Sequence, residues 1–244
     1  MSIWGKIVGG AAGLLTAGPL GALVGAGLGH AIDRSLEDSG AAKQDTALTK
    51  ITFTIGVVAL AAKMAKADGR VTGSEIQAFK RLFQVPASEQ RNVERVFNLA
   101  RQDTAGFEAY AKQIAKLFQA RAAVLEDLLD ALFTIACADG KLHPEEIDYL
   151  RRVAEIFGFD AAAFDCVKAR HMGEGETSPY AVLGVPRDMP SAQIKAAYRA
   201  LVRDNHPDKL VAQGVPEEFM KVATDRLAAI NAAYDKIRAE RGLD

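Results

Sequence analysis

The sequence predicts an all-α fold. Apolar residues recur three and four positions apart over most of the chain, as on one face of a helix, and the alternation typical of a half-buried strand is rare. Hydrophobic residues make up 49% of the 244 residues and charged residues 25%, so the chain can form a packed core. The net charge of −1 gives no general attraction for polyanions, and we expect no nucleic-acid partner.

The first expected element is an uncharged stretch from residue 7 to 29, IVGGAAGLLTAGPLGALVGAGLG. About 20 apolar residues cross the hydrocarbon core of a bilayer, so residues 1–32 are predicted to form a membrane anchor with one transmembrane helix, kinked at Pro19. A cleaved signal peptide and a soluble glycine-rich loop are the alternatives. The apolar region of a signal peptide is usually shorter, and no charged residue interrupts the stretch, as would be expected for a soluble loop.

Small residues recur every four positions along this stretch and would form a stripe on one side of a helix. Such a stripe lets two helices approach closely in lipid, although glycine is also common in membrane helices in general. We therefore expect a homodimer through the transmembrane helix. The stripe consists of Gly9, Gly13, Ala17, Gly21, Gly25 and Gly29.

Positive charges flank the apolar stretch unevenly. Lys6 alone precedes it, whereas Arg34, Lys43 and Lys50 follow it. Because cytoplasmic flanks carry the excess of Lys and Arg, the body of the protein is predicted to be cytoplasmic. Residues 33–50 are polar and are predicted to be a linker.

A helical domain is expected from residue 51 to 172, and it contains an internal duplication. The stretch AKADGRVTGSEI at 65–76 matches ACADGKLHPEEI at 136–147. In each copy one helix is predicted to end at Asp-Gly, where glycine suits the left-handed position after a helix, and a second helix to begin.

Capping chemistry accounts for the polar residues of both copies. Thr72 is predicted to cap the second helix of the first copy in a capping box, and Pro144 to open the corresponding helix of the second. The acidic residues are also candidate ligands for a divalent cation, but caps and turns explain them without a metal, and no EF-hand loop is present. The candidates are Asp68, Glu75, Asp139 and Glu146. The doubled ADG pattern resembles the TerB-like domain of tellurite-resistance proteins, which implies cation binding as an alternative.

A third section, residues 178–244, follows a predicted linker at 173–177. SPYAVLGV at 178–185 is expected to form a one-turn helix, and residues 189–205 an amphipathic helix. Pro216 is expected to open a long final helix. These helices predict an antiparallel hairpin with the sequence RDNHPDKL at its tip.

The tip carries an exposed tripeptide, His206, Pro207 and Asp208. Pro207 restricts its own backbone and that of the preceding residue, so Asp208 is expected to point outward. The chain has four histidines and no cluster of ligands, and no nucleophile or oxyanion donor can be assigned, so we expect no metal site and no enzymatic activity. Two interpretations remain, a helix stop with a solvated charged face or a docking site for an acidic protein partner. The adjacent basic stripe consists of Lys195, Arg199 and Arg203.

PYAVLGV, IKAAYRALVRDNHPDK and LAAINAAYDKI, in this order and spacing, resemble a J-domain. The resemblance implies that this section binds a DnaK-type chaperone and stimulates its ATP hydrolysis without a cofactor of its own. It makes His206, Pro207 and Asp208 the essential loop. It assigns to the surrounding docking face Tyr198, Lys195, Arg199, Arg203 and Lys209.

The complete arrangement resembles the membrane-anchored DjlA co-chaperones of bacteria, on the strength of WGKIVGG, GLGHAID and HPDKLVAQGVP. The resemblance implies a single-pass inner-membrane protein with a short periplasmic N-terminus, a dimerising span and a cytoplasmic body. The Gly/Phe linker and CxxCxGxG zinc repeats of classical DnaJ are absent, so client binding by those modules is not implied. The alternative function is a metal-sensing or stress-response adaptor acting through the TerB-like domain. Cys137 and Cys166 are expected to be ordinary reduced thiols.

Overall fold

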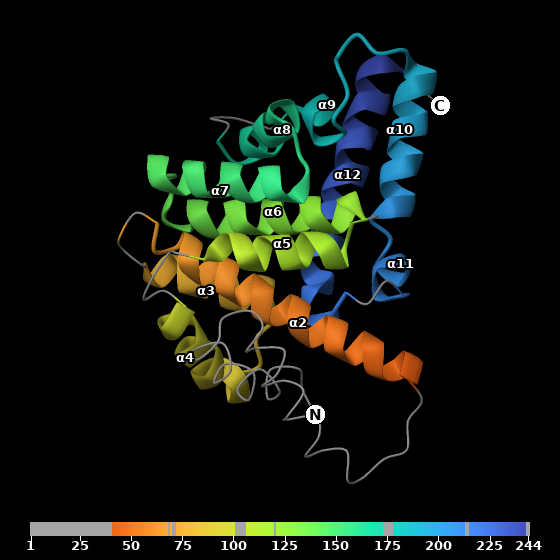
Figure 1. Cartoon of the computed structure of the whole chain (residues 1–244). Helices are drawn as coiled ribbons and strands as arrows, with labels where there is room; N and C mark the ends of the chain where they lie inside the picture. The colour runs from red at the N-terminus through yellow and green to blue at the C-terminus, as the bar shows by residue number, and fades with distance from the viewer. Residues whose placement is uncertain are drawn as a thin grey trace.

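The computed structural model describes residues 41–67, 69, 72–100, 106–119, 121–172, 178–212 and 215–242, and every regular element in these ranges is helical, as predicted. Helices α2 to α8 form a central domain, and α9 to α12 lie beside it (Figure 1). The helices are α2 (Ala41–Met64), α3 (Gly73–Leu82), α4 (Gln90–Ala100), α5 (Phe107–Leu117), α6 (Ala122–Ala136), α7 (Pro144–Phe157), α8 (Ala161–Met172), α9 (Pro179–Val182), α10 (Ser191–Asp204), α11 (Pro207–Ala212) and α12 (Met220–Arg241).

The predicted membrane anchor, with its glycine stripe, lies outside the described residues. None of the helices in the described part of the chain is long and apolar enough to cross a bilayer. The predicted linker at 33–50 differs from the structure in its second half, because α2 already begins at Ala41. The sequence there, AAKQDTALTK, is polar but rich in residues that favour helices, and its polarity alone does not prevent a helix.

Helix α2 is the central helix of the larger domain, and it packs against α4, α5 and α6. Its side chains are buried without interruption from Phe53 to Met64. This burial on all sides follows from the sequence, because residues 51–62 carry no charge. Gly56 allows the close approach of α5, since a Cβ there would lie 2.8 Å from Cδ1 of Ile114.

The first copy of the duplication folds as predicted. Gly69 has a left-handed φ of +85°. At the start of α3 the Thr72 hydroxyl accepts a hydrogen bond from the Glu75 amide (3.2 Å), and the Thr72 amide donates to Oε2 of Glu75 (2.6 Å). This reciprocal pair is the predicted capping box.

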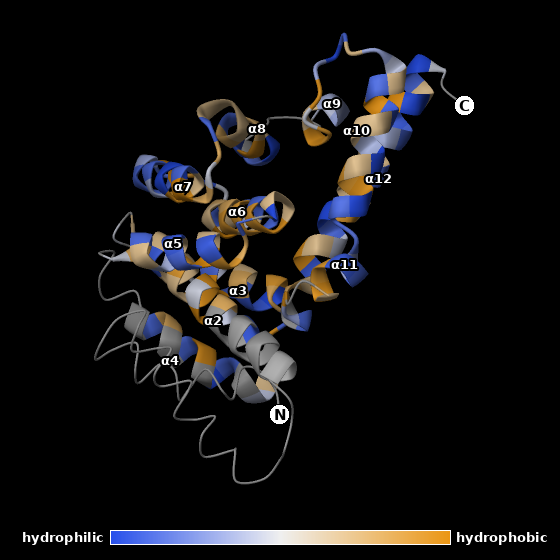
Figure 2. Cartoon of the chain, turned by 45° about the vertical axis from the view of Figure 1, so that its right-hand side comes forward, coloured by the Kyte–Doolittle hydropathy of each residue, from blue (hydrophilic) through white to orange (hydrophobic). Residues whose placement is uncertain are grey.

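The second copy uses the same geometry with different residues. Gly140 has a φ of +86°, and Pro144 is the first residue of α7. The His143 amide donates to Oε2 of Glu146 (2.9 Å). Helix α7 then carries its polar residues on the side away from α6 (Figure 2), and its buried residues include Tyr149, whose hydroxyl donates to the carbonyl of Leu60 in α2 (3.0 Å).

The smaller domain has its own apolar core, formed by α9, α10 and the second half of α12. The predicted one-turn helix is α9, and Tyr180 and Leu183 are both buried there. Ile194 of α10 and Ile237 of α12 are fully buried. Arg241 closes the far end, where its guanidinium donates to the Tyr180 hydroxyl (3.0 Å) and to the carbonyl of Met189 (2.7 Å).

The predicted hairpin differs from the structure at its tip. Pro207 ends no helix; it opens the additional short helix α11. Pro216 does not open α12, because a 3₁₀ turn at Glu217–Phe219 comes first. Within the last helix the charged Arg226 is buried, whereas the apolar Leu227 beside it is half-exposed. The reason is that this part of α12 faces an acidic residue of α6.

Helix α12 joins the two domains because its two halves belong to different cores. Ile230, Ala233 and Ile237 lie in the core of the smaller domain. Val222 and Ala223, by contrast, lie in the same buried cluster as α2 and α6 of the central domain. The sequence pattern predicts two separate domains joined by a linker, whereas in the structure the two domains pack against each other.

Candidate functional site

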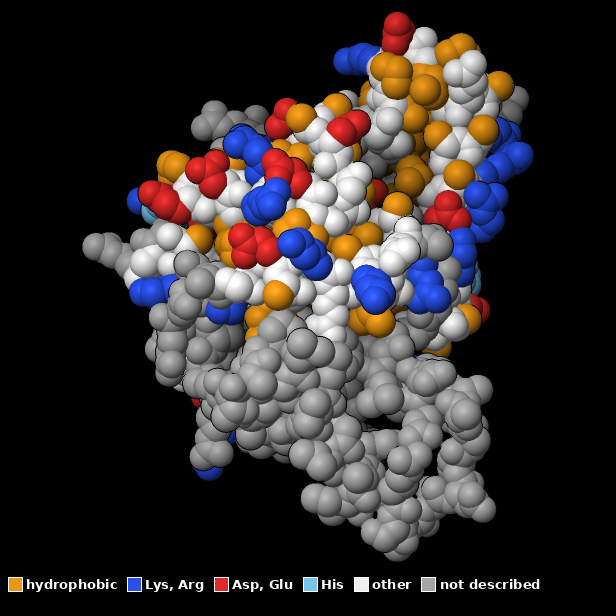
Figure 3. Space-filling view, viewed as in Figure 1, with side chains coloured by type: hydrophobic (Ala, Val, Ile, Leu, Met, Phe, Trp, Pro, Cys, Tyr) orange, Lys and Arg blue, Asp and Glu red, His pale blue; other side chains and the backbone are white. Residues whose placement is uncertain are grey.

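Helix α10 presents the predicted basic stripe to solvent. Its inner side is fixed by Ile194, which is fully buried. Lys195 and Arg199 are exposed, and the side chain of Arg203 is 70% exposed. Figure 3 shows Lys and Arg side chains gathered along the edge of the molecule that α10 forms. This edge therefore carries a positive potential toward solvent.

Tyr198 connects this edge to α12. Its ring stacks on that of Tyr234, with 3.9 Å between the ring centroids and 4° between the ring planes. Its hydroxyl donates to Oδ1 of Asn231 (3.1 Å). Tyr198 is half-buried, so it fixes the spacing of the two helices and still leaves part of its surface for a partner.

Asn205 forms the base of the turn that follows α10. Both its backbone amide (2.9 Å) and its side-chain amide (2.8 Å) donate to the carbonyl of Leu201. Asn205 is only 3% exposed. Because one carbonyl at the end of α10 receives both donors, the chain leaves the helix in a defined direction.

The tripeptide His206, Pro207 and Asp208 follows directly. The side chain of His206 is 52% exposed and that of Asp208 is 94% exposed. The Asp208 amide donates to Nδ1 of His206 (3.2 Å), so this ring nitrogen is an acceptor and carries no proton in this geometry. The imidazole thus caps α11, and the Asp208 carboxylate is left in solvent, as predicted.

An ion pair bridges the two sides of the turn. Nζ of Lys209 lies 2.6 Å from Oδ1 of Asp204. The hydrogen bond from Lys209 is the main cause that lowers the pKa of Asp204. The resemblance to a J-domain assigned Lys209 to the docking face, but in the structure its ammonium pairs with Asp204 inside the turn. Asp204 was missed, although its position five residues before Lys209 was a signal for this pair.

The structure brings most of the predicted docking residues together. They surround an open, shallow depression of about 490 Å³. Lys195 lies further along α10, and Pro207 holds the turn without lining the depression. The site offers cationic groups, one exposed carboxylate and an apolar floor, and these suit recognition of a protein surface more than they suit catalysis. The lining residues are Tyr198, Arg199, Val202, Arg203, His206, Asp208 and Lys209.

Two of the acidic candidates of the central domain, Glu75 and Glu146, cap helices in the structure. Glu75 is 3% exposed and Glu146 is 2% exposed, and each accepts a backbone amide at the start of a helix. Oδ1 of Asp139 accepts the Lys141 amide (2.9 Å), and Asp68 lies outside the described residues. Within the described ranges, no group of three or more His, Cys, Asp or Glu side chains could hold a metal ion.

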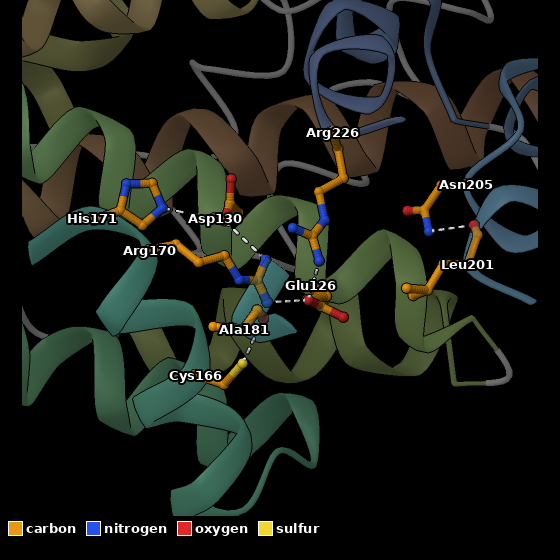
Figure 4. Close-up of polar contacts among 9 residues, drawn as sticks. All are labelled: Glu126, Asp130, Cys166, Arg170, His171, Ala181, Leu201, Asn205 and Arg226. Atoms are coloured by element: carbon orange, nitrogen blue, oxygen red, sulfur yellow. Dashed lines mark hydrogen bonds and ion pairs between the residues drawn. The ribbon is translucent and has the colours of Figure 1, made fainter. Parts of the chain in front are cut away.

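A partly buried polar cluster lies where the two domains meet (Figure 4). Oε1 of Glu126 in α6 accepts from Arg170 of α8 (2.5 Å) and from Arg226 of α12 (2.8 Å). Asp130 accepts from Arg170 (3.2 Å) and lies 3.2 Å from Nε2 of His171. Burial tends to raise the pKa of Asp130, but His171 and Arg170 outweigh it, so this pKa lies below its ordinary value. Glu126 thus links the central domain to α12 through Arg226, while Arg170 holds the same carboxylate from within the central domain.

Asp127 lies beside this cluster, but its carboxylate, unlike those of Glu126 and Asp130, accepts no hydrogen bond from the described residues. It is 1% exposed. Burial, which outweighs the attraction of Arg226, raises the pKa of Asp127 to about 8. The carboxyl group is therefore mostly protonated at neutral pH. No local pattern distinguishes Asp127 from the other acids of α6, so the sequence did not reveal it.

The two cysteines are both free and half-buried. Burial is the main cause that raises the pKa of Cys137 to about 11, which keeps it a thiol. The thiol of Cys166 in α8 lies 3.3 Å from the carbonyl of Ala181 in α9, a further contact between the domains.

Three family models match the chain in succession. The transmembrane domain of the co-chaperone DjlA matches residues 1–45, the tellurite resistance protein TerB matches residues 54–169, and the DnaJ domain matches residues 178–240.

Curated relatives match over almost the whole chain. Co-chaperone protein DjlA of Photobacterium profundum is 30% identical over 275 residues, which cover 98% of this chain and 99% of the relative. The DjlA proteins of Yersinia pseudotuberculosis and Escherichia coli (strain K12) are 30% and 28% identical, each over 99% of both chains. No solved structure matches the chain.

Proposed function

The chain belongs to the DjlA family of co-chaperones, and from this premise we propose that its J-domain docks on a DnaK-type chaperone and stimulates ATP hydrolysis by that partner. The observation that carries the proposal is the Asp208 carboxylate, which is 94% exposed on a turn held from both sides. Asn205 fixes the end of α10, and the Asp204–Lys209 ion pair closes the turn. A carboxylate presented in this way can pair with a cation of a partner at little conformational cost.

The basic edge is proposed to guide this docking. Lys195, Arg199 and Arg203 repeat every four residues on the exposed side of α10, so their charges add along one line. Such a line attracts an acidic surface and orients it before contact. The chain supplies no reacting group in this proposal, because the partner hydrolyses the ATP.

Arg199→Glu tests the role of the basic edge. We expect weaker docking and weaker stimulation, and a larger loss at low ionic strength, because salt screens charges on a surface. The measurement is the rate of ATP hydrolysis by the DnaK-type partner as a function of the concentration of detergent-solubilised full chain at two salt concentrations.

Arg152→Glu is the matched control, since Arg152 is exposed on α7 of the central domain and the change in net charge is the same. A loss of equal size in both variants would attribute the effect to net charge, and the basic edge would then have no special role.

The proposed organisation is a membrane anchor in residues 1–32, a TerB-like domain in 51–172 and a J-domain in 178–244. The order of the three family models supports it. We propose that the anchor is a single span of the bacterial inner membrane, with a short periplasmic N-terminus and the body in the cytoplasm. The positive charges that follow the apolar stretch support this orientation. Tethering would restrict activation of the partner to the vicinity of the membrane.

The anchor is also proposed to form a homodimer through its glycine stripe. Gly25→Leu should prevent close approach of two helices while it keeps the segment apolar. Crosslinking of the full chain in membranes is expected to yield mostly monomer for this variant and dimer for the parent. Gly27→Leu is the control, because two residues further along a helix is nearly the opposite side. Dimer in both variants would show that the stripe is not the interface.

A further inference from the structure

Three apolar residues in α11 and just before α12 are buried in the central domain. Leu210 is 1% exposed, Val215 is fully buried and Phe219 is 2% exposed. All three belong to the cluster that contains Phe53 of α2, and not to the core of the smaller domain. The chain therefore enters a different core within two residues of Asp208.

Phe219 packs its aromatic ring against two phenylalanine rings of the central domain. Its ring meets that of Phe53 edge-on, with 5.0 Å between the centroids and 86° between the planes. Its centroid also lies 5.5 Å from that of Phe83, which follows α3. Such pairs contribute energy beyond the burial of their area, and they fix the orientation of the rings.

Backbone hydrogen bonds connect this anchored segment to the tripeptide. The Val215 amide donates to the carbonyl of Leu210 (3.1 Å), and the Leu210 amide donates to the carbonyl of His206 (3.1 Å). Helix α11 has only 6 residues, too few to be stable by itself. Its position, and with it that of Asp208, depends on where Leu210, Val215 and Phe219 are held.

We propose that the central domain positions the His206–Asp208 turn, and that Phe219, seated between Phe53 and Phe83, is the positioning residue. This role rests on the proposed function, in which the turn activates the DnaK-type partner. One side of the turn is fixed by α10 in the core of the smaller domain, and the other side by the core of the central domain. The turn keeps its active geometry only while both cores hold it.

The test uses full-length variants in which one ring of this contact is reduced. Phe53→Leu changes the central domain and Phe219→Leu changes the segment after α11, and neither touches an exposed docking residue. Phe133→Leu is the matched control. Phe133 is fully buried in the central domain and packs on Phe164 and His171, so this change removes the same atoms from a core position that does not contact Phe219 in the aromatic pairs described.

Two quantities are measured at a temperature where all variants are folded, as judged by thermal unfolding. The first is stimulation of ATP hydrolysis by the DnaK-type partner, with Asp208→Asn as the inactive reference. We expect a decrease of about fivefold for Phe53→Leu and for Phe219→Leu, because the competent geometry of the turn becomes a smaller fraction of the population, and no decrease for Phe133→Leu. The second is hydrogen exchange of the backbone amides of residues 208–212, which should be faster in the same two variants only.

Exchange needs no partner, so it tests the anchoring separately from the proposed function. Unchanged exchange in Phe53→Leu and Phe219→Leu would overturn the inference, whatever the partner does. Equal losses in Phe133→Leu would overturn it as well, because they would attribute the effect to general destabilisation. If exchange rises as expected but even the parent fails to stimulate the partner, the anchoring stands and the proposed function is wrong.

Discussion

Asp208→Asn should reduce stimulation of the DnaK-type ATPase at least tenfold and leave the fold almost unchanged. The Asp208 side chain is 94% exposed, and surface changes of this kind alter the free energy of unfolding by less than about 0.5 kcal/mol. A carboxylate used at an interface is different, because its loss leaves a partner charge unpaired at a cost of about 2–5 kcal/mol. Since about 1.4 kcal/mol corresponds to a factor of ten, the effect on docking should be large.

The measurement is single-turnover ATP hydrolysis by the partner in the presence of detergent-solubilised full chain, with circular dichroism of the same samples. The full chain is required, because an isolated J-domain would expose Leu210, Val215 and Phe219 to solvent. Asp188→Asn is the control, since Asp188 is an exposed carboxylate of the same domain at the other end of α10. If Asp208→Asn stimulates as well as the parent, the docking role is wrong and the tripeptide is only a helix boundary.

Asp127→Asn should remove a large part of the pH dependence of stability. The pKa of Asp127 is raised from 3.8 to about 8 in the folded chain, so the folded state binds a proton that the unfolded state releases above about pH 4. The free energy of unfolding therefore falls as the pH rises from 4 to 8. A difference of one bound proton changes the free energy of unfolding by about 1.36 kcal/mol per pH unit, which amounts to about 4 kcal/mol between pH 5 and pH 8. Asparagine resembles the protonated carboxyl group and does not titrate, so the variant should gain stability relative to the parent toward pH 8.

Chemical denaturation of parent and variant at pH 5 and pH 8 measures this difference. The charged groups that act on Asp127 are Glu126 and Asp130 of α6, Arg170 of α8 and Arg226 of α12, with His171 of α8 on Asp130. They are present in both proteins, so their own titration cancels in the comparison. Asp165→Asn, at an exposed position of α8, should keep the slope of the parent. An equal pH dependence in parent and Asp127→Asn would show that Asp127 is ionised in the fold.

Local chemistry was predictable from the sequence, and long-range packing was not. The capping box of Thr72 and the left-handed Gly69 depend on residues a few positions apart, and both were found. The exposed Asp208 beside a basic stripe was also predicted, because Pro207 and the helical spacing act locally. By contrast, Arg226 pairs with a residue 100 positions away.

The same distinction explains the errors. The later start of α12 and the burial of Arg226 follow from packing on the central domain, which no pattern within residues 178–244 records. The early start of α2 follows from helix propensity in a polar segment, where composition favoured a linker. Asp127 has no signal in the sequence, because the largest cause of its raised pKa is burial in the folded chain.

The late position of Phe219 in the chain also orders events during synthesis on a ribosome. Phe53 and Phe83 belong to the part of the chain that is translated first, whereas Phe219 is translated only after the whole central domain. A nascent chain that has not yet reached Phe219 leaves those two rings without one of their neighbours, and such surfaces are where incomplete chains associate. Arrival of Phe219 covers them and positions the preceding turn in the same step. Under the proposed function, the docking turn therefore reaches its active geometry only after Phe219 has covered this apolar surface.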